Sequence, residues 1–275
     1  MELLRMEHVT ICYNGEPVVQ DVNMELEQGE ILGIVGESGS GKSTLIKAIM
    51  GLLGTEGTVT AGNIWYKGEN LTDMPSKKLR SFLGTEIGMV FQDCKAALCP
   101  VRKVGVQICE AVRAHERLSR KEIKLRAFQI MEKIGLTDAE RIWNSYPFEL
   151  SGGMNQRVGI CIAMILKPNL LLADEATSAL DVTVQKQVVE ELLMMKNEFD
   201  TSMIVVTHNI GVVRAMADKI LVLKDGKVRD YGATDKVLHH SRDIYTRKLM
   251  DSVMRLKVDE YFDAATEEKR HKYVS

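Results

Sequence analysis

Cysteine and aromatic residues are scarce in this sequence, and neither sign of charge dominates. Its 275 residues include five cysteines, two tryptophans, six phenylalanines and seven tyrosines. An odd cysteine count without a Cys-x-x-Cys pair indicates neither a disulfide framework nor a zinc site, so we expect reduced thiols. Few aromatic side chains disfavour a surface that stacks bases. The 36 basic and 38 acidic residues leave no basic excess for nucleic-acid phosphates, and we expect no nucleic-acid partner.

Long apolar segments are also missing. The longest apolar run, residues 158–166, ends at Lys167 and Pro168 and is much shorter than the roughly 20 residues that a membrane span needs. The amino terminus shows no basic region followed by an apolar stretch and a small-residue cleavage site, so no signal peptide is predicted. The chain is therefore not expected to cross a membrane itself, which leaves attachment to a membrane surface open.

The remaining composition is ordinary for a globular protein. Hydrophobic residues make up 45% of the chain and charged residues 27%, which excludes global disorder. Strand-like and helix-like patterns alternate, which predicts an α/β fold with a mostly parallel sheet and helices on its faces. The expected strands are residues 3–13, 18–26, 31–35, 59–67, 86–91, 170–173, 203–206 and 220–223. The expected helices are residues 44–53, 152–166 and 210–217, with another after Asp181.

The middle of the chain is expected to be helical. Ser119-x-x-Glu122 and Thr137-x-x-Glu140 both match the capping box, in which two side chains satisfy free backbone N–H groups at a helix start. Between these two starts the apolar residues are spaced for one buried helical face. They are Ile123, Phe128, Ile130, Met131 and Ile134.

The strongest chemical signal is a glycine-rich segment between the expected strand 31–35 and the helix after it. It reads Gly36-Glu37-Ser38-Gly39-Ser40-Gly41-Lys42-Ser43-Thr44, which matches the P-loop pattern Gly-x-x-x-x-Gly-Lys-Ser/Thr. Glycines let backbone N–H groups turn inward around an anion, and the following helix points its positive end at phosphate. Lys42 should reach the β- and γ-phosphates, and the Ser43 hydroxyl should ligate Mg²⁺. The predicted ATP-binding residues here are Gly36, Ser38, Gly39, Ser40, Gly41, Lys42, Ser43 and Thr44.

A pair of carboxylates forms the second signal. The apolar strand 170–173 ends in Asp174 and Glu175. Ligands of parallel sheets lie at the carboxyl ends of the strands, so Asp174 should meet the Mg²⁺ beside the P-loop. Glu175 is placed to act as the general base for an attacking water.

A third segment, Leu150-Ser151-Gly152-Gly153-Met154-Asn155-Gln156, has the features of a second anion site. A serine hydroxyl and two glycine N–H groups begin the helix that runs to Leu166. One nucleotide does not need two such sites, so the second is expected to serve an ATP bound to another subunit. Leu-Ser-Gly-Gly-x-x-Gln shortly before an Asp-Glu strand end resembles the signature of ABC ATPases.

Further motifs of that family occur in the expected order over about residues 1–250. Phe91-Gln92 resembles the Q-loop, whose glutamine touches Mg²⁺ and reports to the membrane subunit. Residues 178–181, Ser-Ala-Leu-Asp, resemble the D-loop, which places Asp181 at the dimer interface. Thr207-His208 resembles the switch histidine, which contacts the γ-phosphate. Tyr13 resembles the aromatic residue that stacks on adenine, and simple packing beside the Asn14-Gly15 turn stays open for it.

The resemblance implies an ABC-type P-loop fold. The expected parts are a RecA-like core, an N-terminal antiparallel β subdomain and an inserted helical subdomain at about residues 95–165. Residues 1–250 would form one nucleotide-binding domain, and residues 251–275 a tail. ATP and Mg²⁺ are the implied cofactors, Ser43, Gln92 and Asp174 the metal ligands, Glu175 and His208 the catalytic residues. Ser151, Gly152, Gly153, Gln156 and Asp181 would bind nucleotide across the dimer.

Several finer motifs resemble those of the ATPases that power peptide and nickel import. They are Gly-Glu-Ser-Gly-Ser-Gly-Lys-Ser, Phe91-Gln92-Asp93, Tyr146-Pro147, Ser-Gly-Gly-Met, Ala-Asp-Glu-Ala-Thr-Ser-Ala-Leu-Asp, and Gly211-Val212-Val213. The segment from Cys94 to Pro100, Asn155 and Asn209 depart from that group's usual residues, but none of them removes a catalytic group. The short chain without a late cysteine cluster favours nickel or a metal chelate as substrate, with di- or oligopeptide import as the alternative.

The resemblance also implies partners and a location. A second ABC ATPase subunit is expected, in a heterodimer with a homodimer as the alternative, together with two transmembrane permease subunits. An extracellular or periplasmic solute-binding protein would deliver substrate, and the chain would sit peripherally on the cytoplasmic face of the cell membrane. A non-transport ABC ATPase that acts on ribosomes or DNA is less favoured, because the balanced charge disfavours binding to nucleic acid.

Overall fold

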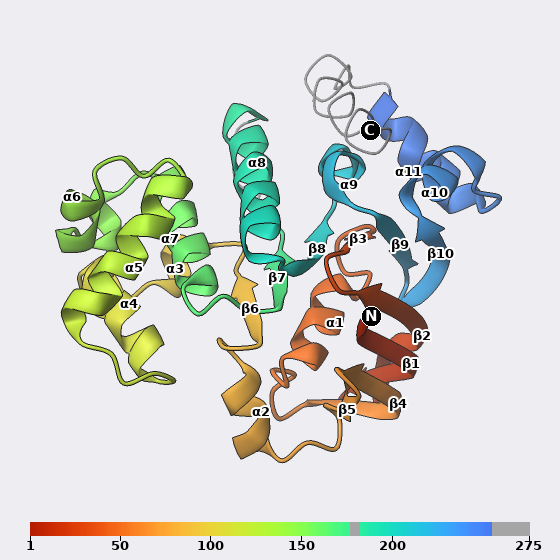
Figure 1. The fold of residues 1–275 in the computed structure, drawn as a ribbon. Coiled ribbons are helices and arrows are strands. Elements are labelled where there is room, and N and C mark those ends of the chain that lie inside the picture. The colour runs from red at the N-terminus through yellow and green to blue at the C-terminus, as the bar shows by residue number, and fades with distance from the viewer. Residues whose placement is uncertain (177–181, 255–275) are drawn as a thin grey trace. The chain divides into compact units, whose positions relative to one another are not determined.

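A computed structural model describes residues 1–176 and 182–254 (Figure 1). The chain divides into two compact units, one formed by Met1–Thr72 and the chain from Val205 onward, the other by Asp73–Ile204. No helix within the described ranges combines the length and the apolar character that a bilayer span requires.

An antiparallel sheet begins the first unit. Its strands are β1 (Glu2–Tyr13), β2 (Glu16–Glu27), β4 (Gly57–Tyr66) and β5 (Glu69–Asn70), in the order β2-β1-β4-β5. Asn14 and Gly15 join β1 to β2 with positive φ angles of 51° and 83°, which suits the two-residue hairpin turn that their types favour. The N-terminal antiparallel sheet that the sequence predicts is therefore confirmed.

Parallel strands follow in the same unit. β3 (Ile31–Val35) is buried at every residue and pairs in parallel with β9 (Lys219–Lys224), which pairs antiparallel with β10 (Lys227–Ala233). A strand that is apolar throughout is typical of a sheet covered on both faces. The described part of this unit also contains the helices α1 (Lys42–Ile49), α9 (Ile210–Met216), α10 (Thr234–His240) and α11 (Ile244–Met254).

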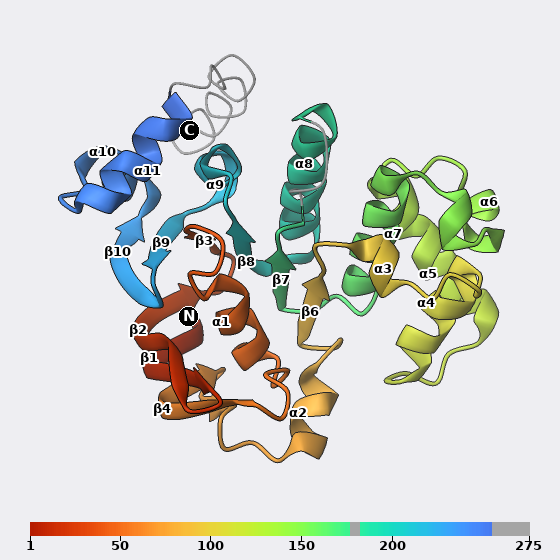
Figure 2. The same ribbon diagram turned by 180° about the vertical axis from the view of Figure 1, so that it is seen from behind.

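The second unit contains the parallel pair β6 (Ile87–Val90) and β7 (Leu170–Asp174), and the chain leaves the unit within β8 (Ser202–Thr207). Figure 2 shows α4, α5, α6 and α7, whose bounds follow, gathered as one helical group. The elements of this unit that remain are α2 (Ser76–Phe82), α3 (Cys94–Ala97), α4 (Val104–Arg113), α5 (Arg120–Lys133), α6 (Ala139–Asn144), η1 (Pro147–Glu149), α7 (Gly152–Met164) and α8 (Val182–Phe199).

The helical group packs around Trp143, whose side chain is 2% exposed. Phe128 meets it edge to face with ring centroids 5.9 Å apart. A Cβ atom on Gly105 would lie 2.3 Å from the same indole ring, so only glycine lets α4 approach it. The predicted buried face of α5 is confirmed except at Phe128, which is half-buried because Ala127 occupies the fully buried position instead.

Two local predictions are wrong in detail. The capping box at Ser119 and Glu122 is confirmed, but Thr137 does not cap α6. Asp138 does, because its carboxylate accepts the Arg141 N–H at 3.2 Å and also bonds the Arg141 side chain, a charge-assisted pair that a threonine lacks.

The helix expected at 44–53 spans Lys42–Ile49. It begins earlier than predicted because Gly41, rather than a polar side chain, occupies the N-cap position. It ends earlier because Gly51, directly after the C-cap residue Met50, adopts a positive φ of 63°, a conformation typical of a helix end.

The contact between α3 and α7 depends on Gly159. A Cβ atom at Gly159 would lie 2.3 Å from the Cys94 Sγ and 3.0 Å from its Cβ. We therefore expect Gly159→Ala to lower the free energy of unfolding by about 1–3 kcal/mol through overpacking, measured as a lower urea midpoint. Cys94→Ala in the same chain should recover a large part of that loss. An unchanged midpoint in Gly159→Ala, or no recovery in the double variant, would contradict this contact.

Candidate functional site

The loop between β3 and α1 carries the P-loop residues. Gly39 and Gly41 adopt positive φ angles of 80° and 100°, a region that side-chain-bearing residues rarely enter. Gly36 has no room for a side chain, because a Cβ there would lie 2.1 Å from the Leu223 carbonyl oxygen. The three glycines of the motif are therefore required by the path of the loop.

The start of α1 has no side-chain cap, because its N-cap is Gly41. A helix N-terminus that follows a glycine-rich loop is the kind of element that binds an anion in proteins. The Lys42 ammonium donates to the carbonyls of Gly36 at 2.9 Å and Glu37 at 2.7 Å, and Lys42 is buried. The Ser40 hydroxyl is also buried and has no hydrogen-bond partner. A phosphate oxygen is the kind of group that would satisfy it.

The predicted catalytic carboxylates lie where β7 ends. Asp174 is its last residue and Glu175 follows, both half-buried. Glu175 has a φ angle of 48°, a left-handed conformation that non-glycine residues adopt at a cost of order 1–3 kcal/mol. Such strain clusters at functional sites and gives the carboxylate a direction different from that of a continuing strand.

His208 follows the end of β8 and is exposed. The residues on either side of it are fixed. Thr207 Oγ1 accepts the Asn209 N–H at 3.0 Å, and the Asn209 side chain caps α9 by accepting the Gly211 N–H at 2.9 Å. His208 therefore stands on a rigid strand-to-helix turn.

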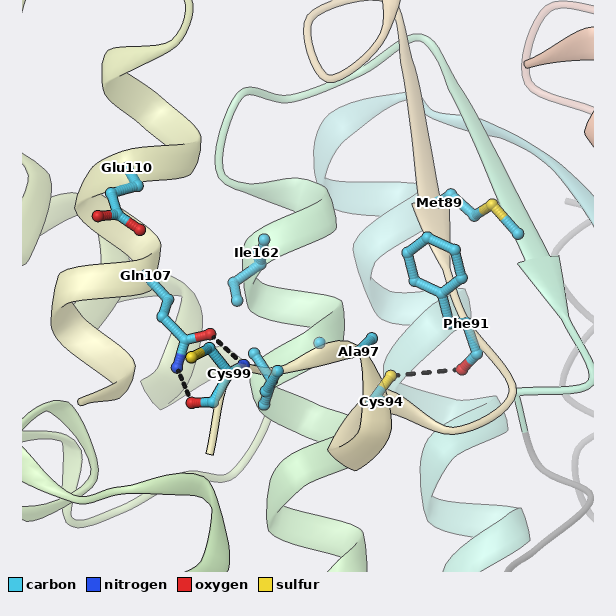
Figure 3. Close-up of a pocket in the computed structure, with 10 residues that line it drawn as sticks. Met89, Phe91, Cys94, Ala97, Cys99, Gln107, Glu110 and Ile162 are labelled. Carbon is cyan, nitrogen blue, oxygen red and sulfur yellow. Dashed lines mark hydrogen bonds between the residues drawn. The ribbon is translucent and has the colours of Figure 1, made fainter. Parts of the chain in front are cut away.

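The segment after β6 leads into a cavity of about 270 Å³. Phe91 is 45% exposed, and Asp93 caps the short helix α3 by accepting the Ala96 N–H at 2.9 Å. Figure 3 shows the Gln107 side chain turned onto the Cys99 backbone. It accepts the Cys99 N–H at 2.8 Å and donates to the Cys99 carbonyl at 3.1 Å. The walls also include Met89, Cys94, Ala97, Leu98, Glu110, Gly159 and Ile162.

Burial raises the pKa of the Cys94 thiol to about 11. Its sulfur donates to the Phe91 carbonyl at 3.4 Å. The thiol therefore stays protonated and unreactive at neutral pH. Gln107 was not singled out from the sequence, because an amide inside a helix carries no local signal for a bond to a loop eight residues away.

The side chain of Asn155 stabilises the backbone turn at the start of the signature segment. Ser151 caps α7 by accepting the Met154 N–H at 3.3 Å, and Gly152 faces open space. The Asn155 amide is buried and donates to the carbonyls of Pro147, Leu150 and Ser151 at 2.9, 3.2 and 3.2 Å. One buried amide thus fixes the turn that presents Ser151 and Gly152.

Two further buried groups stand beside the signature. The Gln156 side-chain amide nitrogen has no hydrogen-bond partner. The Arg157 guanidinium bonds Glu191 of α8 at 2.6 Å. Burial raises the pKa of Glu191, and the arginine opposes that shift.

The structure brings some of the predicted site residues together and describes others separately. Gly36, Ser38, Gly39, Ser40, Gly41, Lys42, Ser43 and Thr44 come together as one loop and helix start. Tyr13 ends β1, and its ring edge would lie 2.8 Å from a Cβ on Gly57, so the ring packs against that glycine. Residues 178–181, with Asp181, lie outside the described residues.

The predicted catalytic and metal-binding residues are divided between the two units. Lys42, Ser43 and His208 belong to the first unit, and Gln92, Asp174 and Glu175 to the second.

Comparison with known proteins identifies similar sequences. A family model described as ABC transporter matches residues 19–178. The metal-staphylopine import system ATP-binding protein CntD of Staphylococcus aureus is 38% identical over 264 residues, which cover 95% of this chain and 96% of that protein. The oligopeptide transport ATP-binding protein AmiE of Streptococcus pneumoniae is 41% identical over 242 residues, 88% of this chain and 68% of that protein.

Solved structures have the same fold. The ATP-binding cassette MJ0796, a dimer in a post-hydrolysis state bound to ADP and Pi, superposes with a TM-score of 0.74 and 29% identity over 84% of this chain and 99% of that chain. The CbiO1 subunit of a Clostridium perfringens transporter complex superposes with a TM-score of 0.75 and 26% identity over 94% and 96% of the two chains.

Asn155→Ala should loosen the turn before α7. Three carbonyls each lose a donor, two of them buried, so we expect the free energy of unfolding to fall by about 1–3 kcal/mol. Amide exchange within residues 147–151 should accelerate. Asn144→Ala is the matched control, since its exposed amide also bonds a helix carbonyl, that of Glu140 at 2.9 Å. Equal urea midpoints for the two variants would show that the Asn155 amide does not hold this turn.

Proposed function

This chain belongs to the ABC transporter family, and from that premise we propose that it is the ATP-hydrolysing subunit of an importer of the peptide/nickel type. The observation that carries the proposal is the P-loop itself, with its uncapped helix start and the buried, unpartnered Ser40 hydroxyl. Relatives that cover most of the chain are named as metal-staphylopine and oligopeptide import subunits. Hydrolysis of ATP by such subunits drives transport.

ATP binding would use the first unit. The N–H groups around Gly39 and Gly41 would surround the phosphates, and the Lys42 ammonium would leave the carbonyls of Gly36 and Glu37 for the β- and γ-phosphates. Thr44, in the first turn of α1, and Gly36 and Ser38 would complete the phosphate site, and Tyr13 would contact adenine.

Mg²⁺ fits the proposed donor set. A hydroxyl from Ser43, an amide oxygen from Gln92 and a carboxylate from Asp174 are oxygen ligands of the kind that Mg²⁺ prefers. When bound, the ion would neutralise charge on the β- and γ-phosphates. These three residues would hold it.

Hydrolysis would be carried by Glu175 and His208. The water oxygen attacks the γ-phosphorus, the bond from that phosphorus to the β–γ bridging oxygen breaks, and the products are ADP and phosphate. Glu175 accepts the proton that the water loses. His208 would donate a hydrogen bond to the γ-phosphate, and its place on a fixed turn would orient the imidazole.

The signature segment would act on a nucleotide held by a second ABC ATPase subunit. Ser151, Gly152 and Gly153 begin a helix whose N-terminus is exposed, and they would meet the γ-phosphate of the partner's ATP, with Gln156 and Asp181 beside it. The MJ0796 cassette is dimeric in its ADP-bound form. We propose a heterodimer, with a homodimer as the alternative.

The cavity behind Phe91 would receive a membrane permease subunit. Its walls are mostly apolar, Phe91 is exposed at its edge, and the lining residues Phe91 and Cys94 flank the Q-loop glutamine in the sequence. One of the two permease subunits would bury Phe91 here and move Gln92 with it. The departures at Cys94 and Cys99 line this cavity, so they would adjust the fit to the permease.

The transporter would place this chain on the cytoplasmic face of the membrane and use an extracellular or periplasmic solute-binding protein. Residues 1–250 would form one nucleotide-binding domain with the helical subdomain at about 95–165, where α3 to α7 lie. The substrate would be nickel or a metal chelate, in line with the full-length similarity to the metal-staphylopine subunit. Di- or oligopeptide import is the alternative that the second relative supports.

Glu175→Gln should arrest hydrolysis without preventing ATP binding. The amide cannot take the proton, so we expect ATPase activity to fall at least about 100-fold, and a dimer that persists in ATP should appear by gel filtration. Glu190→Gln, on an exposed position of α8, should behave as wild type. Wild-type turnover in Glu175→Gln would remove Glu175 from the role of general base.

Uptake measurements test the transport reaction and its substrate. Lys42→Ala should weaken ATP binding and reduce uptake of radiolabelled nickel to background, while Lys47→Ala, exposed one turn further along α1, should not. Excess short peptide should leave nickel uptake unchanged. Nickel uptake that is the same in the Lys42→Ala cells would refute import of free nickel. Labelled metal chelates and di- and oligopeptides, taken up in the same cells, would then decide among the remaining substrates.

A further inference from the structure

A tyrosine from the end of the described chain holds the P-loop. The Tyr245 hydroxyl, in the first turn of α11, accepts the backbone N–H of Glu37 at 3.2 Å. Glu37 follows Gly36 in the glycine-rich loop. Both residues belong to the first unit, and 208 positions separate them in the sequence.

The Tyr245 backbone is fixed by the cap of its own helix. Asp243 accepts the Thr246 N–H at 2.8 Å and the Thr246 hydroxyl at 3.2 Å, and Thr246 is fully buried. The Ser241 hydroxyl accepts the Asp243 N–H at 3.2 Å and donates to the Asp230 carboxylate of β10. These hydrogen bonds connect the start of α11 to β10. The backbone that carries Tyr245 is therefore fixed beside the P-loop.

The Tyr245 side chain has little freedom of its own. Its ring faces the Lys224 ammonium, which lies 4.4 Å from the ring centroid, within the range of a cation–π contact. Burial raises the pKa of Tyr245, and the Glu37 and Asp225 carboxylates act in the same direction. The hydroxyl therefore stays protonated at neutral pH.

Glu37 is the residue that connects this bond to Lys42, the predicted phosphate-binding lysine. Its N–H is held by Tyr245, and its carbonyl accepts the Lys42 ammonium at 2.7 Å. The next fixed point is Ser40, whose carbonyl accepts the Gly226 N–H from the turn between β9 and β10 at 3.1 Å. Two backbone groups of the loop, the Glu37 N–H and the Ser40 carbonyl, are thus hydrogen-bonded by residues that follow β9.

We propose that Tyr245 is a positioning residue for nucleotide binding, whose hydroxyl holds the Glu37 peptide so that the P-loop is preformed around the phosphates. This inference rests on the proposed function in one respect, that the ligand of the loop is ATP. A loop that has to be ordered when ATP arrives binds more weakly than one already ordered. Loss of the hydroxyl should therefore act on nucleotide affinity more than on the chemical step.

The test compares Tyr245→Phe with Tyr231→Phe in the full-length chain. Tyr231 is a matched control, because its hydroxyl accepts the Glu25 N–H at 3.0 Å and donates to the Glu25 carbonyl at 2.9 Å, away from the P-loop. In Tyr245→Phe the Glu37 amide should exchange with solvent roughly two- to tenfold faster, as expected from loss of one hydrogen bond. The control should leave Glu37 exchange unchanged.

Nucleotide measurements complete the test. The Kd of a fluorescent ATP analogue and the KM for ATP should both rise by roughly two- to tenfold in Tyr245→Phe, with kcat within about twofold of wild type. Tyr231→Phe should change neither affinity. Unchanged Glu37 exchange would show that the bond does not hold the loop, and a fall in kcat with unchanged KM would overturn the positioning role. Failure of the wild-type chain to bind ATP would instead refute the proposed function, while Glu37 exchange would still decide whether Tyr245 holds the loop.

Discussion

The close contact between the P-loop and β9 is the constraint on which the first unit depends. Gly36 lies so near the Leu223 carbonyl that no side chain fits, and Ser40 receives a hydrogen bond from Gly226. The loop can follow this path because β3 and β9 are parallel neighbours, and β9 continues past the end of β3 to place Leu223 beside Gly36. Gly33 in β3 is required for the same steric reason, because a Cβ there would lie 2.3 Å from the Val213 side chain of α9. The nucleotide loop and the strand before it are thus shaped by elements that lie far downstream in the sequence.

A single helix plays the corresponding part in the second unit. α7 begins with the signature residues, continues through Asn155, which fixes the preceding turn, and then presents Gly159 to Cys94 of α3. The cavity that we assign to a permease and the segment that we assign to a partner's ATP are therefore linked by one rigid element. A movement imposed at the cavity would reach Ser151 through α7 without any need for a separate relay.

Local chemistry explains which predictions were right. Asn14-Gly15, the continuously apolar strand 31–35 and the capping box at Ser119 each depend on residues adjacent in sequence, and the structure has all three. Competition explains the error at α6, since Asp138 and Thr137 are neighbouring candidates for one cap and the carboxylate with an arginine partner occupies it. β10 was not predicted because its burial is mostly partial and its sequence is largely polar. It is a strand because β9 provides its hydrogen bonds.

The sequence by itself determined the α/β class, the family and the motifs. Glycines at forced backbone angles, a lysine after them and carboxylates at a strand end carry their chemistry within a few residues. Tertiary structure alone decided what holds those motifs in place: Tyr245 on Glu37, Asn155 on the turn before α7, and Cys94 against Gly159. Two of these contacts join residues far apart in the chain, and the third depends on a buried amide whose acceptors appear only once η1 and α7 have formed. Such contacts leave no periodic or local trace, because they depend on where the folded backbone brings the groups together.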